Sequence, residues 1–500
     1  MNALEDAPLE TSGWQRLSPV SVAYFIIKFA VSFVKATIQN ILPAIAVFSV
    51  FAENKLLWFS IAIPTIIISI TSYAFLYYCY FKFKVREGEI LIHRGVFKKE
   101  HLNLEFGRIQ NVNIIRPLYF APFKVVNCLI ESAGSKGAEI ELPGVAEAFA
   151  NDTRSKVFAA EKHIEIEETQ TDAPEPASIP EKLSNWEVAK SGLTSYFAFV
   201  ALAAMAPFSD RIGRYLFENL FSDLLDSLQS VVGFRVVAGM ILLIGIVFLS
   251  LFLLISGSML GALARYYNYE LHDKGDRLVR LTGFFERKST TLKKSKVQSV
   301  SISQNLAARM LGRVKLQYRQ IGVSHAKRND ASVHIPILRP DQGPSFTSIV
   351  FPDCPEPTFD EISPSYIRRT FVFFWLIPIS ITISTLSIFI SKLFLLGFIF
   401  LVPGILILML RYHRYGFWHN DEYGAIRQGF IGKRVTIFPL HKLQIANIQQ
   451  SRGQRIKNLG NLTIQLGSGV VSIPYLPMEK LSRFVNLALH KTESSLKPWM

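Results

Sequence analysis

Hydrophobic residues along this chain fall into long runs without charge. Between consecutive charged residues, six segments reach the length of a helix that crosses a bilayer, which takes roughly 17–25 apolar residues. These segments are residues 36–52, 56–81, 191–209, 236–264, 370–391 and 393–410. The first contains Gln39, Asn40 and Pro43, so its helix begins earlier if Lys28 and Lys35 extend to the membrane surface. The pattern predicts six transmembrane helices in three hairpins.

A soluble stretch follows each hairpin, and its polar pattern is that of β-structure. Apolar and polar residues alternate in Glu89–His93, Val112–Ile115 and Leu462–Leu466, which predicts half-buried strands. Residues 478–489 instead space their apolar positions by three and four, which predicts a helix. We therefore expect each stretch to form antiparallel strands followed by one helix, because a curled sheet closed by a helix covers an apolar face that a lone hairpin leaves open.

The three soluble stretches repeat one pattern. Each has a glycine followed by two apolar residues, and thirteen residues after the glycine a triplet of a basic residue, an apolar residue and glutamine begins. The glycines are Gly95, Gly283 and Gly429, the basic residues Arg108, Lys296 and Lys442, and the glutamines Gln110, Gln298 and Gln444. Each copy closes with an alternating strand that we expect to end at Pro143, Pro336 or Pro474. We interpret the triplet as structural, because its apolar residue points to the core, and ligand contact is the alternative.

The triplets and closing prolines resemble those of bacterial pleckstrin-homology-like (PH-like) domains of the membrane-anchored kind. The arrangement of three hairpins, each followed by such a domain, is similar to that of YdbT-like membrane proteins, and the resemblance covers nearly the whole chain. It implies a PH-like antiparallel β-domain, capped by a C-terminal helix, after each hairpin. It implies a fold and no activity.

These observations divide the chain into seven parts. The predicted parts are an N-terminal tail with hairpin 1 (1–81), PH-like domain 1 (82–160), an acidic, proline-containing linker (161–190), hairpin 2 (191–265), PH-like domain 2 (266–368), hairpin 3 (369–411) and PH-like domain 3 (412–500). Within hairpin 2, leucines or isoleucine recur every four residues over 212–228, which predicts a helix lying in the membrane interface.

The net charge of +15 is concentrated where helices leave the bilayer. Residues 82–108 carry seven Lys or Arg against four acids, 265–298 nine against four and 411–442 six against two, whereas the hairpin turns hold few cations. This asymmetry predicts a multi-pass protein of the bacterial inner membrane with both termini and all three domains in the cytoplasm. The same clusters predict contact with anionic headgroups. Their members are Lys82, Lys84, Arg86, Arg277, Arg280, Arg287, Lys288, Lys293, Lys294, Arg427, Lys433 and Arg434.

Motifs of catalysis are weak or missing in the sequence. His413, His419, Asp421 and Glu422 lie close together but match no zinc spacing, and strand alternation sends them to different faces. Residues 429–433 have the glycine and lysine of a phosphate loop without its first glycine or its Ser/Thr. Three scattered cysteines suggest neither a disulfide framework nor a metal site. We therefore expect no catalytic residue, cofactor, metal or nucleic-acid partner.

Two classes of function remain. The first is a non-enzymatic scaffold whose PH-like domains bind anionic lipid headgroups or a partner membrane protein that carries the same kind of domain. Exposed sheet edges, which invite strand addition, favour such a protein partner. The second is a lipid-handling or small-molecule transporter or export component, which needs ionisable residues inside the spans. The predicted spans hold few of these beyond Lys28 and Lys35, and this favours the scaffold.

Overall fold

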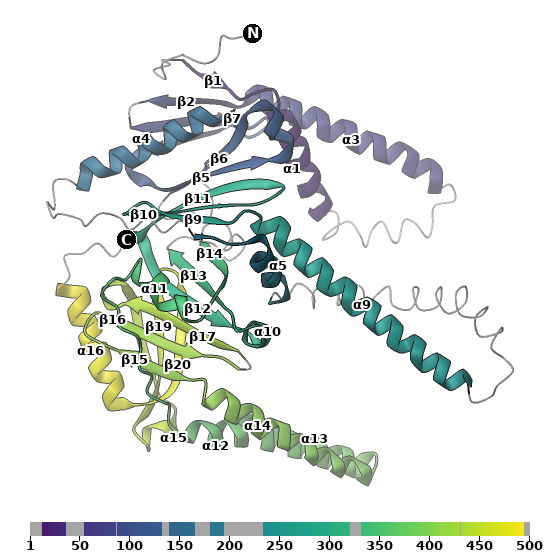
Figure 1. Cartoon of the computed structure of the whole chain (residues 1–500), viewed down its shortest axis with the longest axis vertical. Coiled ribbons are helices and arrows are strands. Elements are labelled where there is room, and N and C mark those ends of the chain that lie inside the picture. The colour runs from purple at the N-terminus through teal and green to yellow at the C-terminus, as the bar shows by residue number, and fades with distance from the viewer. Residues whose placement is uncertain are drawn as a thin grey trace. The chain divides into compact units, whose positions relative to one another are not determined.

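The computed structural model describes residues 13–36, 55–86, 88–132, 140–165, 181–194, 234–320, 332–430 and 432–494. The chain divides into two compact units, whose elements are shown in Figure 1. Unit 1 contains Met1–Ala177 together with Val279–Leu281 and Phe285–Thr291, and unit 2 contains the remainder.

Unit 1 holds the first repeat. Its helices are α1 (Ser21–Ala36), α3 (Lys55–Tyr80) and α4 (Glu147–Glu165). Its first sheet has the order β1 (Gln15–Arg16), β2 (Lys82–Arg86), β3 (Glu89–Arg94) and β4 (Glu100–Glu105). Its second sheet consists of β5 (Ile109–Pro117), β6 (Val125–Ser132) and β7 (Ile140–Ala146), and β11 (Glu286–Lys293) pairs antiparallel with β5. The strands and α4 enclose one apolar core that includes Ile90, Val112 and Ile140.

Unit 2 holds most of the second repeat. Its elements are β8 (Glu181–Lys182), α5 (Asn185–Leu193), α9 (Phe234–Tyr266), β9 (Glu270–Asp273), β10 (Arg277–Thr282), β12 (Val297–Gln304), α10 (Leu306–Met310), β13 (Val314–Gln320), β14 (Val333–Leu338) and α11 (Gln342–Ser348). The closing helix of this repeat, α11, has only seven residues, against 19 in α4. Its shortness limits how much of the sheet it can cover.

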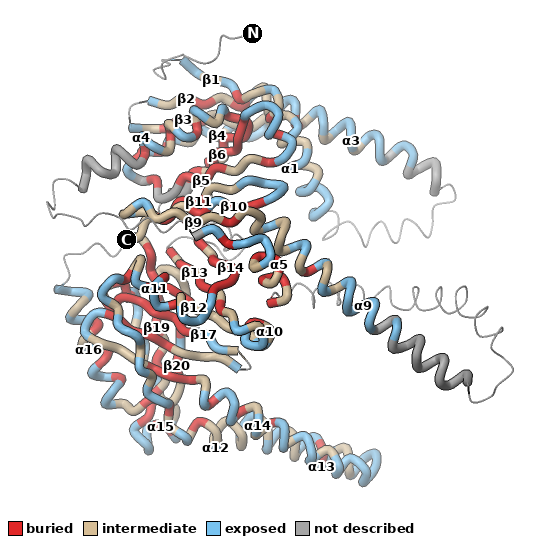
Figure 2. The backbone as a smooth tube through the Cα atoms, viewed as in Figure 1, coloured by how far each residue is buried: buried red, intermediate tan, exposed pale blue. Residues whose placement is uncertain are grey.

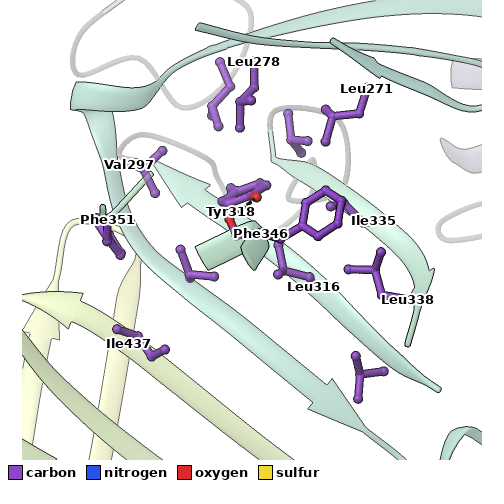
Figure 3. Packing of buried hydrophobic residues seen from close by; sticks show 14 of the residues in the cluster. Leu271, Leu278, Val297, Leu316, Tyr318, Ile335, Leu338, Phe346, Phe351 and Ile437 are labelled. Carbon is purple, nitrogen blue, oxygen red and sulfur yellow. Dashed lines mark hydrogen bonds between the residues drawn. The ribbon is translucent and has the colours of Figure 1, made fainter. Parts of the chain in front are cut away.

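The third repeat completes unit 2. Its hairpin consists of α12 (Ser365–Phe371), a π-helical turn (Val372–Leu376), α13 (Ile377–Phe389), a 3₁₀ segment (Lys392–Phe400) and α14 (Leu401–Tyr412). The strands are β15 (Gly416–His419), β16 (Tyr423–Gln428), β17 (Lys433–Pro439), β18 (Leu443–Gln449), β19 (Leu459–Leu466) and β20 (Gly469–Pro477), with α15 (Arg452–Arg455) before β19 and α16 (Met478–Ser494) at the end. Strands β12 and β17 pair, and apolar residues from both sides of this pair, such as Val297 and Ile437, belong to one buried cluster (Figure 3).

Long apolar helices stand out from the cores. Among the described residues, four segments are long and apolar enough to cross a membrane: Ile63–Tyr80, Phe248–Tyr266, Ser365–Phe389 and Lys392–Tyr412. Most of their surface is exposed, as the blue stretches of α3, α9 and α13 show in Figure 2. Several of their hydroxyls bond to carbonyls of their own helices, as in the bonds from Thr65 to Ile61 and from Thr385 to Ile381, and so do not need water. Most of residues 36–52 and 191–209, and the interfacial helix predicted at 212–228, lie outside the described residues.

The glutamine of each triplet occupies a β-bulge. The register shifts between Ile109 and Asn111 in the first repeat, between Val297 and Ser299 in the second, and between Leu443 and Ile445 in the third. The basic residue before it ends a 3₁₀ turn in each copy. The triplet is therefore the corner at which the chain leaves the first sheet and enters the second.

The closing prolines lie inside their strands, so the expectation that they end the strands is wrong. Strands β7, β14 and β20 continue for three, two and three residues past Pro143, Pro336 and Pro474. The register shifts beside each proline, where two residues of the closing strand face one residue of its neighbour. A bulge tolerates proline because the extra residue needs no ladder hydrogen bond. The prolines thus mark equivalent bulges.

The outer edge of each first sheet is covered by the chain segment that precedes the hairpin. In the first repeat β1 pairs with β2, and in the second β8 pairs with β9. In the third, Asp360 forms a bridge with Phe417 of β15. The sequence pattern indicated none of these short pairings, because two residues carry no readable alternation.

Candidate membrane-surface site

The turn after each repeat glycine lies beside the end of an apolar helix. In unit 1, Phe97 is 90% exposed and its ring lies 6.2 Å from that of Tyr73 in α3. In unit 2, the backbone amide of Gly283 donates to the Tyr267 carbonyl, and that of Phe284 donates to the Ala264 carbonyl at the end of α9. The turn of the first repeat therefore lies against α3 at Tyr73, inside the candidate span, and the turn of the second repeat lies at the end of α9.

Glycine is required at these turns for two reasons. Gly95 and Gly283 have φ angles of 103° and 114°, which residues with a side chain rarely adopt. At Gly429, an added Cβ would collide with the Gly432 carbonyl, as one at Gly95 would with the Lys98 carbonyl.

The third repeat holds a cleft of about 710 Å³ between its hairpin and its second sheet. One wall is apolar and comes from the hairpin helices, with Phe374, Trp375 and Leu408, joined by Phe430 from the glycine turn. The other wall is polar and comes from the strands, with Gln449, Asn461, Thr463 and Ser472. The cleft is thus amphipathic, and it lies where candidate spans meet a soluble domain.

Arg411 supplies a cation to this cleft. Its Nε donates to the Tyr415 hydroxyl at 3.1 Å, and its guanidinium lies 5.7 Å from the centre of the Tyr415 ring. The Tyr415 ring packs edge-on against that of Tyr366, with centroids 5.5 Å apart. Within the described part of the chain, no carboxylate lies within ion-pair distance of Arg411. Its terminal nitrogens are therefore suited to an anion that enters the cleft.

Arg427 borders the cleft through the backbone of Tyr415, and Arg414 and Lys433 lie close enough to Arg427 to interact with it electrostatically. An Nη of Arg427 reaches the Tyr415 carbonyl at 3.5 Å, and the guanidinium lies 4.9 Å from the centre of the Phe359 ring. Burial lowers the pKa of Lys433, and the positive charges of Arg427 and Arg414 lower it further. Charges that disfavour each other in this way bind an anion more strongly, because it relieves their repulsion.

Other sequence-predicted cations are distributed differently. Arg280 is only 4% exposed and donates to the Thr290 hydroxyl, so it is not a surface residue. Ion pairs hold Arg86 to Glu89, Arg277 to Asp276, Lys288 to Glu286 and Lys294 to Asp273. Lys82 and Lys84 lie half-buried on β2, Arg287 is exposed on β11, Lys293 ends β11, and Arg434 is exposed on β17. In the third cluster, Arg427 borders the cleft through the Tyr415 carbonyl, and Arg411 is the cation that lines the cleft itself.

Among the triplet residues whose side chains are described, Lys442 and Gln298 are buried in the fold. Lys442 is 5% exposed, and its ammonium donates to the carbonyls of Ser295 and Val297, the latter at 2.9 Å. Burial lowers the pKa of Lys442 to about 8. Gln298 is fully buried, whereas Gln444 is exposed. Lys442 thus joins two repeats through the triplet of the second.

The described residues contain no group of three or more His, Cys, Asp and Glu that could hold a metal ion. The imidazole of His419 packs against Phe417 and Phe484, with ring centroids 5.6 Å and 5.4 Å apart. His413 instead packs against Tyr412, at 5.1 Å. These histidines therefore belong to separate environments.

The cleft was not predicted from the sequence. Its lining runs from Tyr366 to Pro474, and no local pattern joins such distant residues. The aromatic and basic residues at both ends of the third hairpin, Tyr366, Arg411 and Tyr415, were the available signal, because tyrosine and arginine concentrate at membrane interfaces.

Comparison with known proteins places these features in a family. The sequence profile described as "Bacterial PH domain" matches residues 30–157, 227–350 and 372–492. The chain is 23% identical over 471 residues to the UPF0699 transmembrane protein YdbT of Bacillus subtilis (strain 168), which covers 91% of this chain and 93% of that protein. No solved structure matches. The family match agrees with the three glycine-to-triplet copies found in the sequence and with their shared bulges. The chain therefore belongs to the bacterial PH domain family and is a membrane protein with three copies of that domain.

Proposed function

We propose that this protein is a non-enzymatic scaffold of the bacterial inner membrane, and that its third PH-like domain binds the headgroup of an anionic lipid in the cleft beside hairpin 3. The three domains lie in the cytoplasm in this proposal, in keeping with the basic residues that follow each hairpin. The amphipathic cleft with Arg411 is the observation that carries the proposal.

A lipid fits this cleft better than a water-soluble ligand. The apolar wall of Phe374, Trp375 and Leu408 belongs to candidate spans, so an acyl chain can contact it without leaving the membrane. A phosphate at the level of Arg411 can then form charge-assisted hydrogen bonds, while Gln449 and Ser472 face the polar part of the headgroup. Both halves of a phospholipid thereby meet surfaces of matching polarity.

The test measures lipid affinity of the full-length protein. Delipidated protein in a mild detergent is titrated with short-chain phosphatidylglycerol and, separately, with phosphatidylcholine of the same chain length, and bound lipid is counted by native mass spectrometry. We expect R411Q to weaken phosphatidylglycerol binding by roughly ten- to a hundredfold, because a hydrogen bond to a charged group contributes about 1.5–3 kcal/mol. Binding of phosphatidylcholine should be weaker than that of phosphatidylglycerol in the parent protein.

R368Q is the matched control. Arg368 is an exposed arginine of the same hairpin that does not line the cleft. The R368Q variant should bind phosphatidylglycerol with the same affinity as the parent protein. If R411Q and R368Q bind phosphatidylglycerol with equal affinity, the cleft is not the headgroup pocket. Positive charge near the membrane would then attract the lipid without a specific site.

A further inference from the structure

Two strand pairings between repeats follow the same register. Strand β12 pairs with β17 so that Ile302 faces Val435 and Ser303 faces Arg434. Within unit 1, β5 pairs with β11 so that Ile114 faces Ser289. When the repeats are aligned on their triplets, Ile114 corresponds to Ile302 and Ser289 corresponds to Val435. In both cases, the first strand of the second sheet of one repeat pairs with the last strand of the first sheet of the next repeat. The register is the same in both cases.

One strand of each kind is left at a sheet edge. Strand β18 of the third repeat corresponds to β5 and β12, and it lies at the edge of the order β18-β19-β20. Strand β4 of the first repeat corresponds to β11 and β17, and it lies at the edge of the order β1-β2-β3-β4. The series of pairings between repeats therefore leaves β18 without a neighbour at one end and β4 without a neighbour at the other.

The exposure of β18 shows what a neighbouring strand normally covers. In β12, Ser301 pairs with Thr436 of β17 and is 3% exposed. The corresponding residue of β18, Asn447, is exposed, and the nearby Ile445 is 53% exposed. The same strand of the repeat is thus buried where a partner strand is present and open where it is not.

Strand β4 shows the complementary difference. In β17, which is paired, Val435 and Ile437 are 8% and 3% exposed. The corresponding residues of β4, His101 and Asn103, are exposed. Both ends of the series therefore carry surfaces that their counterparts bury.

Neither end carries lysine or proline, and the bulge at Gln444 in β18 also occurs in β5 and β12, which do accept a neighbouring strand. Natural sheets block edges with lysine, proline or inward charges. Strand β18 (Leu443–Gln449) contains no charged residue and no proline, and it exposes Ile445. Strand β4 carries charge only at its ends, Glu100 and Glu105, and one histidine. Such edges accept an added strand through main-chain hydrogen bonds.

We infer that β18 of one copy of this chain pairs with β4 of a second copy, in the register that joins the repeats within the chain. A second copy is the partner because its β4 is the last strand of the first sheet of a PH-like domain, the same kind of strand that β5 and β12 pair with inside the chain. In this pairing Ile448 faces His101 and Gln449 faces Glu100. The interface is heterologous, so it joins copies head to tail into a ring or a row in the membrane.

The test traps the pairing with cysteines in native membranes. Two differently tagged full-length chains are co-expressed, one with I448C and the other with H101C, and in parallel one with Q449C and the other with E100C. Adjacent positions alternate between hydrogen-bonded and non-hydrogen-bonded pairs, so one combination has the closer geometry for a disulfide. Cys79 and Cys354 are replaced by serine, and the fully buried Cys128 is kept.

We expect mild oxidation to link the two tags in at least one combination, several-fold more than in the control combination of H101C with V470C. Val470 is 63% exposed on β20, in the same sheet as β18 but outside the proposed pairing. The additional substitution I445K should lower the I448C–H101C product, whereas V470K should not.

Three results would overturn the inference. Equal linkage of H101C to I448C and to V470C would mean random collision. Linkage between two I448C chains would mean a symmetric contact. Linkage of I448C to a different membrane protein, without any product to H101C, would assign the edge to another partner. Loss of lipid binding in R411Q leaves the crosslinks unaffected, so this test fails or succeeds separately from the proposed function.

Discussion

The ion pair between Glu187 and Arg313 gives a quantitative test of how hairpin 2 is held to its domain. Glu187 lies in the first turn of α5, and Arg313 immediately precedes β13. The guanidinium donates from Nε to one carboxylate oxygen at 3.1 Å and from Nη2 to the other at 2.9 Å. This two-point contact fixes the helix that leads into the second hairpin against the sheet of PH-like domain 2.

The expected energy follows from the pKa of Glu187. The hydrogen bonds from Arg313 lower this pKa from 4.5 to about 2, which sets an upper limit of about 3 kcal/mol on the stabilisation at neutral pH. The side chains of Glu187 and Arg313 keep 29% and 21% of their exposure, so solvent screening reduces the contribution to about 1–2 kcal/mol. We expect E187Q to lower the unfolding temperature by about 4–16 °C at pH 7, taking the second domain as the cooperative unit.

The pH dependence has a definite sign. Because the pKa of Glu187 is lower in the folded protein, the stabilisation is fully present above pH 4.5 and disappears as the pH falls toward 2. Thermal unfolding of the full-length protein in detergent, recorded by tryptophan fluorescence at several pH values from 7 to 3, should show parent and E187Q converging at the acid end. A double-mutant cycle with R313Q isolates the pair from other titrating groups.

The exposed pair of Lys182 and Glu270 is the control. Its Nζ–Oε1 distance is 3.3 Å, but the Lys182 side chain is 65% exposed, so its coupling should stay below about 0.5 kcal/mol. A difference between parent and E187Q that is the same at pH 7 and pH 3 would refute the electrostatic account. Equal coupling in the two pairs would contradict the role of burial.

Two further predictions concern hairpin packing and topology. G192A should lower stability by about 1–3 kcal/mol, because the added Cβ would collide with the Ser258 carbonyl where α5 meets α9, whereas G261A, with nothing within 4 Å, should be neutral in the same thermal assay. A reporter fused after Met500 should indicate the cytoplasm and one inserted at Ser391 the opposite side, and a periplasmic signal from Met500 would exclude the proposed orientation.

Sequence patterns were sufficient for the features that depend on short-range regularity. Charge-free runs of spanning length marked the helices at 56–81, 236–264, 370–391 and 393–410, where the structure has candidate spans. The thirteen-residue interval from glycine to triplet marked the repeat because each copy needs the same turn and the same bulge.

Features that depend on long-range assembly could not be obtained in this way. The prolines were expected to end strands because proline cannot donate to a ladder, and the bulge that accommodates Pro336 becomes visible only when its neighbour's register is known. Arg280 counted as a surface cation because charge is usually exposed, yet its strand position turns it toward Thr290. The cleft around Arg411 needs strands and helices that lie up to a hundred residues apart.

The short pairings that cover the outer sheet edges constrain the route of the chain through the membrane. Gln15 is held opposite Phe83, Glu181 opposite Leu271, and Asp360 opposite Phe417, so the residues before and after each hairpin belong to one sheet. A chain that leaves a sheet and returns to the same sheet crosses any bilayer in between an even number of times. In the proposed three-hairpin topology, each hairpin would then be a closed loop of its own domain, and a substitution that shortens one span would not be absorbed by re-threading the rest. Insertion of a hairpin and completion of its sheet would become parts of one folding event.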